Sequence, residues 1–258
     1  MGSEFGYAYD FRLSMVSVDE INSKYKSELK DGVKTFLFEF RTNFILKKKR
    51  PENVDEEEAA EVIIDSERFD AYIHPTGNEK RDLLELSVMS SYRLSEYWMT
   101  RAEIHFLLNE TLDFTRSLVS DPQYVSLNPI PVVVYVEVHT VQQKNETLNN
   151  AMDRAIRAEH LAPLYLWPQP TIVESGEMCS YRLSYLRGLT RVRVENAVDG
   201  LALMPICPIC KRCGRVGSQI TTLPGCGHAF HSHCVIRWIA SKEKDVCPSC
   251  RRRAFPFP

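Results

Sequence analysis

Eight cysteine and histidine residues near the C-terminus constrain this chain more than any other feature. They form four pairs, whose members are separated by one or two residues: Cys207 and Cys210, Cys226 and His228, His231 and Cys234, and Cys247 and Cys250. Thiolate sulfur and imidazole nitrogen are preferred Zn²⁺ ligands, and this separation lets one tight turn present both to a tetrahedral ion. Eight such ligands complete two four-coordinate sites without an open position, which is typical of structural zinc. The sequence therefore predicts two zinc ions that fold a small domain.

Two further residues compete for a place among these ligands. Cys213 follows Cys210 at the separation found in the pairs, and His233 lies between His231 and Cys234. We expect Cys213 to be a loop thiol and His233 an exposed neighbour of the ligands. How the four pairs combine stays open at this point, because their spacing allows sequential as well as interleaved pairing.

The order of three cysteines, two histidines and three cysteines resembles a RING finger of the two-histidine kind, over residues 205–253. In RING fingers the pairs interleave in a cross-brace. The resemblance thus implies one ion bound by the first and third pairs and another bound by the second and fourth. The first ligand set would be Cys207, Cys210, His231 and Cys234, and the second Cys226, His228, Cys247 and Cys250.

Four residues beside the ligands extend the resemblance. Ile209, Trp238 and Pro248 occupy the positions at which RING ligases place the apolar surface that docks a ubiquitin-conjugating enzyme. Arg251 follows the last ligand, and a basic residue there implies a catalytic role in orienting the conjugating enzyme and its ubiquitin. The structural alternative is that Ile209 merely fills space between ligands and that Trp238 is a core aromatic of a short helix after Cys234.

The resemblance implies a RING-type ubiquitin ligase, which positions a loaded conjugating enzyme without forming a covalent intermediate itself. Its partners would be the conjugating enzyme, ubiquitin and an unknown protein substrate recruited by the N-terminal part. A first alternative is a zinc-stabilised interaction module without ligase activity. A second is a two-step ligase that accepts ubiquitin on Cys179, although a lone cysteine in a strand-like segment is usually a buried apolar residue.

The length of 258 residues leaves room for two domains, and we expect an α+β chain that ends in the zinc-stapled finger. The predicted boundaries are a probable cloning scar at 1–5, an α+β substrate- or partner-binding domain at 6–196, a linker at 197–206, the finger at 207–253 and a tail at 254–258. A finger of this size has little apolar core, so structural zinc, which contributes about 10–16 kcal/mol, should decide whether it folds.

Strand and helix periods alternate through the larger domain, which favours α+β. Alternating apolar residues predict strands at 36–40 and 132–138. Helical spacing occurs at 94–118 and 148–156, and residues 181–195 have the pattern of a hairpin that leads toward the finger. No phosphate-binding loop or nucleophile elbow is present, so we expect no separate active site in this domain.

Composition limits the compartments and the binding partners that we expect. Only Cys179 and Cys213 lie outside the predicted ligand set, so no disulfide framework is expected and the thiols indicate the cytoplasm or the nucleus. No apolar run approaches the roughly 18 residues of a membrane span. Nine of the 32 Lys and Arg residues but only two of the 34 Asp and Glu residues lie in 205–258. This positive finger could attract nucleic acid, but it lacks interleaved aromatic residues, so we expect none as a partner.

Overall fold

The computed structural model describes residues 6–16, 34–48, 61–122, 124, 127–162, 164, 185–186, 188–242 and 246–254. The chain divides into two compact units, Met1–Val141 and Gln142–Pro258. We call these the first and second units. The division lies well before the predicted boundary at residues 197–206. Among the described helices, none is both long and apolar enough to span a bilayer.

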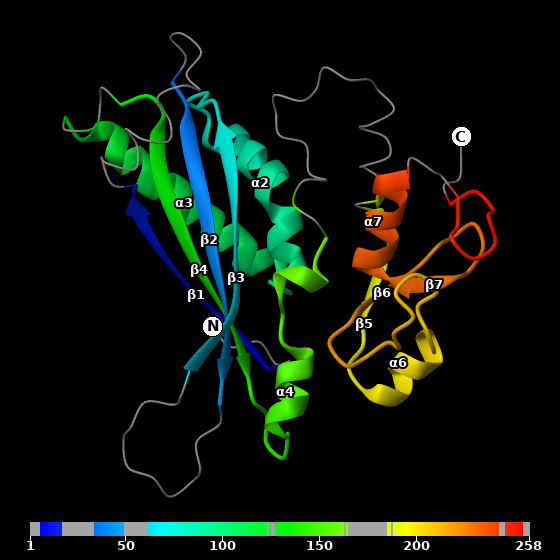
Figure 1. Cartoon of the computed structure of the whole chain (residues 1–258). Helices are drawn as coiled ribbons and strands as arrows, with labels where there is room; N and C mark the ends of the chain where they lie inside the picture. Colours follow the sequence, from blue (N-terminus) through cyan, green and yellow to red (C-terminus); the bar gives the residue numbers. More distant parts are fainter. Residues whose placement is uncertain are drawn as a thin grey trace, which may run out of the picture. The chain divides into compact units, whose positions relative to one another are not determined.

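A four-stranded sheet organises the first unit (Figure 1). Its strands are β1 (Tyr7–Met15), β2 (Phe36–Lys47), β3 (Glu61–Ile73) and β4 (Ile130–Val141), arranged in the order β1-β4-β2-β3. β1 pairs with β4 and β2 with β3 in antiparallel register, whereas β2 and β4 run parallel. Strands β2 and β4 confirm the two strands expected from alternating phenylalanine and valine residues. Both are central strands, so they are buried on both faces along most of their length.

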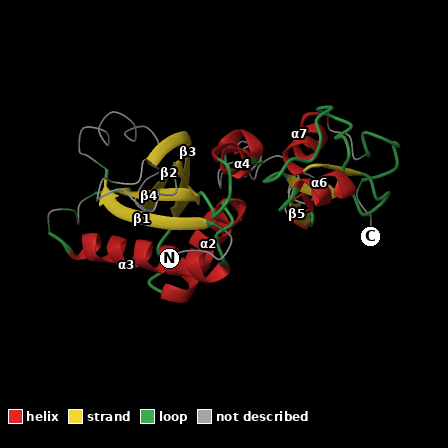
Figure 2. Ribbon diagram, turned by 90° about the horizontal axis from the view of Figure 1, so that it is seen from below, coloured by secondary structure: helices red, strands yellow, loops and turns green. Residues whose placement is uncertain are grey.

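Two helices, α2 (Glu79–Glu96) and α3 (Arg101–Ser120), cover one face of this sheet (Figures 1 and 2). The helical period expected at 94–118 is interrupted, because the chain turns between the two helices. Trp98 adopts a left-handed backbone conformation with φ 66° in this turn. Thr100 then caps α3 in a capping box with Glu103, which satisfies backbone donors at the new helix start.

The second unit contains a smaller, antiparallel sheet in the order β5-β6-β7. Its strands are β5 (Arg191–Arg193), β6 (Gln219–Thr222) and β7 (Ala229–His231). Its fully described helices are α4 (Leu148–Arg154), the 3-10 turn η1 (Ala158–His160), α6 (Ala197–Leu203) and α7 (Ser232–Lys242). Helix α4 confirms the helix expected at 148–156, although it ends at Arg154.

The hairpin predicted for residues 181–195 is not what the described residues form. Tyr185 and Leu186 are helical, and β5 pairs with β6 rather than with a strand preceding it. Residues 181–184 and 187 lie outside the described part of the chain. The predicted linker at 197–206 contains α6, whose backbone approaches the finger so closely that a Cβ atom on Gly200 would lie 2.2 Å from the carbonyl oxygen of Gly214.

Residues before the finger share its hydrophobic core. Apolar side chains from the preceding segment pack in one buried cluster with residues of the finger's strands and helix. The former are Ala162, Leu186, Leu189, Val194 and Met204, and the latter include Ile220, Phe230, Val235 and Ile239. Tyr185 Oη also donates a hydrogen bond of 2.7 Å to the carbonyl oxygen of Ala254, just beyond the finger. The second unit is therefore a finger built together with the segment that precedes it.

Candidate metal centres

The first metal centre combines the first and third ligand pairs. Cys207 and Cys210 come from a turn after α6, His231 ends β7 and Cys234 lies in the first turn of α7. One ligand atom from each of these four residues lies within 4.8 Å of the others. Strand pairing between β6 and β7 and the start of α7 thus carry the third pair to the first.

The second metal centre combines the second and fourth pairs. Cys226 and His228 lie in the turn between β6 and β7, while Cys247 and Cys250 follow α7. Their ligand atoms again lie within 4.8 Å of one another. The four pairs therefore interleave, as the RING resemblance implies, and the sequential pairing left open by the sequence is excluded.

The two Cys-Pro-x-Cys segments form matching turns. In the first turn, the amide of Cys207 donates to the carbonyl oxygen of Arg212 (2.8 Å). The amide of Lys211 donates to the carbonyl oxygen of Cys207 (2.9 Å). The second repeats both bonds, from Cys247 to Arg252 (2.7 Å) and from Arg251 to Cys247 (2.9 Å). Lys211 and Arg251, which follow the second cysteine of each turn, adopt φ 62° and 59°. Each turn thus holds its two sulfur atoms on one side.

Hydrogen bonds orient the histidine of the first centre. His231 Nδ1 lies 3.3 Å from Cys210 Sγ, and Nε2 lies 3.2 Å from the carbonyl oxygen of Cys213. With Nε2 protonated and donating to this carbonyl, Nδ1 presents its lone pair to the sulfur atoms, as a zinc ligand requires. Cys213 itself belongs to neither cluster, and His233 instead stacks on His231 with ring centroids 5.5 Å apart. Neither residue is a member of a ligand set, and His233 is half-buried rather than exposed as expected.

The second centre contains an imidazole nitrogen that fits a metal ligand. His228 Nδ1 is buried and has no hydrogen-bond partner in the described part of the chain. A buried, unpaired nitrogen costs free energy, which coordination of a cation would recover. Together with three sulfur atoms, this nitrogen completes a Cys₃His set, which is a closed structural zinc site.

Crowding of the sulfur atoms shifts the thiol pKa values. A hydrogen bond between the side chains of Cys207 and Cys234 lowers the pKa of Cys207. The same bond raises the pKa of Cys234 well above its ordinary value. Burial raises the pKa of Cys226 to about 11. Neighbouring thiolates repel one another, so three can be ionised together only beside a cation. Zn²⁺ supplies that charge, and the two clusters are suited to bind two zinc ions.

The predicted docking residues lie around these centres. Ile209 and Trp238 are half-buried and pack against the finger core, and part of each side chain stays accessible to solvent. Pro248 is half-buried, and Arg251 is exposed. The Cys213 carbonyl oxygen could not be predicted as a partner of His231, because any residue type can contribute a backbone acceptor.

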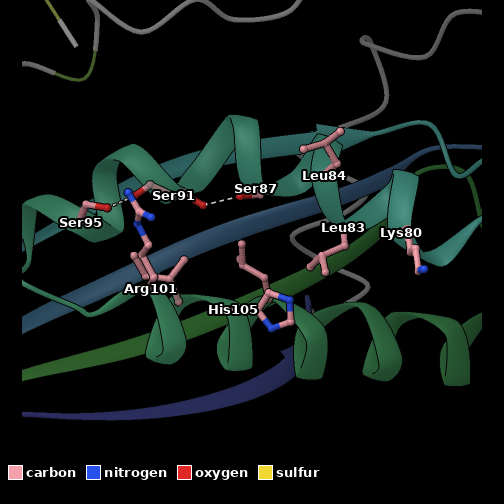
Figure 3. Close-up of a pocket in the computed structure, with 10 residues that line it drawn as sticks. Lys80, Leu83, Leu84, Ser87, Ser91, Ser95, Arg101 and His105 are labelled. Atoms are coloured by element: carbon pink, nitrogen blue, oxygen red, sulfur yellow. Dashed lines mark hydrogen bonds between the residues drawn. The ribbon is translucent and has the colours of Figure 1, made fainter. Parts of the chain in front are cut away.

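A groove lies between α2 and α3 in the described part of the first unit (Figure 3). Its volume is about 480 Å³. Leucine and isoleucine side chains and three serines of α2 line it, together with the basic residues Lys80 and Arg101 and with His105, which lies between these two in the view of Figure 3. The lining residues are Lys80, Leu83, Leu84, Ser87, Ser91, Ser95, Arg101, Ile104, His105 and Leu108, and none is acidic.

Two interleaved Cys/His centres built on a small antiparallel sheet and one helix define a cross-brace zinc finger. Residues 205–251 match the family of the Ring finger domain, so the chain carries a RING finger with two histidine ligands.

Named relatives agree with this assignment. E3 ubiquitin-protein ligase RNF6 of Mus musculus is 31% identical over 106 residues, covering 34% of this chain and 15% of that protein. E3 ubiquitin-protein ligase RHA1B of Arabidopsis thaliana is 50% identical over 38 residues, or 15% of this chain and 24% of that protein. Anaphase-promoting complex subunit 11 of Dictyostelium discoideum is 50% identical over 26 residues, or 10% and 30%. The chain thus spans less than a third of each of these relatives.

Proposed function

We propose that this protein is a RING-type ubiquitin ligase. The observation that carries the proposal is the cross-brace finger, with both metal centres assembled and with similarity to proteins named E3 ubiquitin-protein ligases. A ligase of this type holds a conjugating enzyme, loaded with ubiquitin as a thioester, beside a lysine of the target. Its contribution to the rate is proximity and orientation, and the zinc ions maintain the fold that positions the partners.

In this proposal Ile209, Trp238 and Pro248 dock the conjugating enzyme, and Arg251 contacts both that enzyme and its ubiquitin. The half-buried state of Ile209 and Trp238 supports docking, because core contacts hold the side chains in place while part of each surface stays accessible. The exposed guanidinium of Arg251 offers planar hydrogen-bond donors to carbonyl groups of both partners. Cys179 lies outside the described residues, and this mechanism does not require it.

The direct test incubates the purified chain with ubiquitin, activating enzyme and a panel of conjugating enzymes, and follows self-modification and ubiquitin discharge. Ile209→Ala should weaken docking of the active conjugating enzyme by about 2 kcal/mol, roughly thirtyfold, while two zinc ions stay bound. Ile206→Ala is the matched control, because Ile206 is 60% exposed and precedes the first ligand. An inert wild-type protein with every conjugating enzyme would instead favour a zinc-stabilised interaction module.

We further propose that the groove between α2 and α3 recruits the substrate, as a helix with an apolar face and acidic residues at its ends. Leu83, Leu84 and Ile104 offer apolar contacts, and the wall has basic residues but no carboxylate. Such a surface complements an amphipathic helix that carries negative charge.

This recruitment is testable with two synthetic helical peptides that share a leucine face but carry either glutamate or lysine at both ends. Fluorescence anisotropy should show binding of the acidic peptide only. Leu84→Asp should abolish it, whereas Val88→Asp, on the same helix and also well exposed but outside the groove, should not. Equal binding of both peptides, or equal effects of the two variants, would reject the groove as the recruiting surface.

A further inference from the structure

We propose that Asp10, Glu137 and His139 form a third metal site, in the first unit, for a divalent transition cation of the Zn²⁺ class. The site lies on the face of the sheet opposite α2 and α3 (Figure 2). Phe11 of β1 stacks edge-on against Phe106 of α3, with ring centroids 5.8 Å apart. Because side chains alternate along a strand, Asp10 points to the opposite face.

Strand register places the two carboxylates directly beside each other. Asp10 of β1 is the cross-strand partner of Glu137 of β4 in the antiparallel pair. Like charges at such positions destabilise a strand pair, so this arrangement calls for a neighbouring cation. His139 follows Glu137 by two residues and therefore lies on the same face.

The imidazole of His139 is directed at both carboxylates. Its Nε2 atom lies 3.3 Å from Asp10 Oδ2 and 3.6 Å from Glu137 Oε2, and the three ligand atoms lie within 4.8 Å of one another. The side chain is only 4% exposed, yet neither ring nitrogen has a hydrogen-bond partner in the described part of the chain. A buried imidazole without such partners carries a free-energy cost that a bound cation would recover.

The donor set selects the class of cation. Two carboxylate oxygens and one imidazole nitrogen suit Zn²⁺ and related transition ions, whereas Mg²⁺ and Ca²⁺ prefer oxygen ligands alone. Three protein ligands leave a coordination position open, unlike the closed centres of the finger. The side chains of Asp10 and Glu137 are 72% and 48% exposed, which gives an ion a path from solvent. We therefore infer a weaker, exchangeable site.

The competing explanation is an ion triad, in which protonated His139 alone balances the two carboxylates. The two explanations differ in metal stoichiometry and in the sign of a stability change. If the three residues are a metal site, Asp10 and Glu137 repel each other in the metal-free protein and destabilise the strand pair. In the metal-bound protein the same two residues stabilise it. If the triad is only an ion pair, removing either carboxylate weakens the pair whether or not metal is added.

The first measurement is equilibrium dialysis of the full chain, with two zinc ions already in the finger, against increasing free Zn²⁺. We expect a third zinc ion per chain, with affinity reduced at least tenfold in Asp10→Asn and in Glu137→Gln. Glu110→Gln is the matched control, because it removes another exposed carboxylate, from α3, and this variant should bind the third zinc ion with the affinity of wild type. No third ion in wild type, or a third ion held equally by both site variants, would overturn the proposal.

The second measurement is thermal unfolding of the same proteins with and without added Zn²⁺. Zinc should raise the unfolding temperature of the first unit in wild type, because a ligand that binds only the folded state stabilises it. Asp10→Asn should be at least as stable as wild type without added zinc and should not respond to zinc. The ion triad is established instead if Asp10→Asn is less stable than wild type both with and without zinc, and if added zinc does not change the unfolding temperature of wild type.

Discussion

Arg93 is a buried cation whose loss should strongly destabilise the first unit. Its side chain is 4% exposed and forms ion pairs with Glu67 and Glu96, whose side chains are 5% and 2% exposed. Replacing it with alanine would leave two carboxylates without a counter-charge in the interior. We expect Arg93→Ala to lower the free energy of unfolding by about 3–5 kcal/mol. Urea unfolding followed by circular dichroism measures this change.

The control for Arg93 is Lys47→Ala. Lys47 and Glu61 also join two elements of the first unit, at 2.6 Å, but both side chains are about 40% exposed. Solvent screens such a pair, so its removal should cost no more than about 1 kcal/mol. Equal losses in the two variants would mean that burial does not decide the contribution of these ion pairs.

Arg251 can be tested without disturbing its zinc centre, because the first metal-binding turn provides a twin. Arg251 and Lys211 both adopt a left-handed backbone, in which a non-glycine residue costs roughly 1–2 kcal/mol and glycine does not. Arg251→Gly and Lys211→Gly should therefore both retain two zinc ions. Only Arg251→Gly should slow ubiquitin discharge from the conjugating enzyme, measured in single-turnover assays. Equal rates in the two variants would contradict the orienting role proposed for Arg251.

At the scale of elements, α6 depends on a glycine that meets the finger backbone. A Cβ atom on Gly200 would lie 2.2 Å from the carbonyl oxygen of Gly214 and 2.8 Å from Val194 Cγ1. Gly200→Ala should therefore push α6 away from the finger and destabilise the second unit by about 1–3 kcal/mol or more. Thermal unfolding and the rate of zinc release to a competing chelator measure the effect. Gly188→Ala is the control, since nothing lies within 4 Å of its added methyl group.

These elements show what a sequence can and cannot disclose. The ligand pairs were predictable because each closes within a few residues, but their spacing did not decide between sequential and interleaved pairing. The strands at Phe36–Phe40 and Val132–Val138 followed from local alternation. The contact of Gly200 with Gly214 was not predictable, because close backbone approach has no periodic signature. The helix break at Trp98 was hidden by apolar spacing that continues across it.

At the scale of the whole molecule, the division after Val141 predicts where the chain can be cut. A fragment of residues 142–258 retains Leu186, Val194 and Met204 in the core shared with the finger, whereas residues 205–258 lose them. Burial of each such side chain contributes about 1.5–3 kcal/mol. We expect the longer fragment to hold two zinc ions and unfold cooperatively. The shorter fragment should release zinc to a chelator much faster, because its apolar core is incomplete.

The complementary fragment, residues 6–141, supplies the control for this division. Its sheet and two helices enclose a core of their own, with Phe38, Phe40 and Phe44 each at most 1% exposed. It should therefore unfold in one cooperative transition even with chelator present. In the full chain, chelator should then remove the transition of the second unit and leave that of the first. If residues 205–258 alone proved as stable as 142–258, the shared core would contribute nothing, and the finger would be the folding unit by itself.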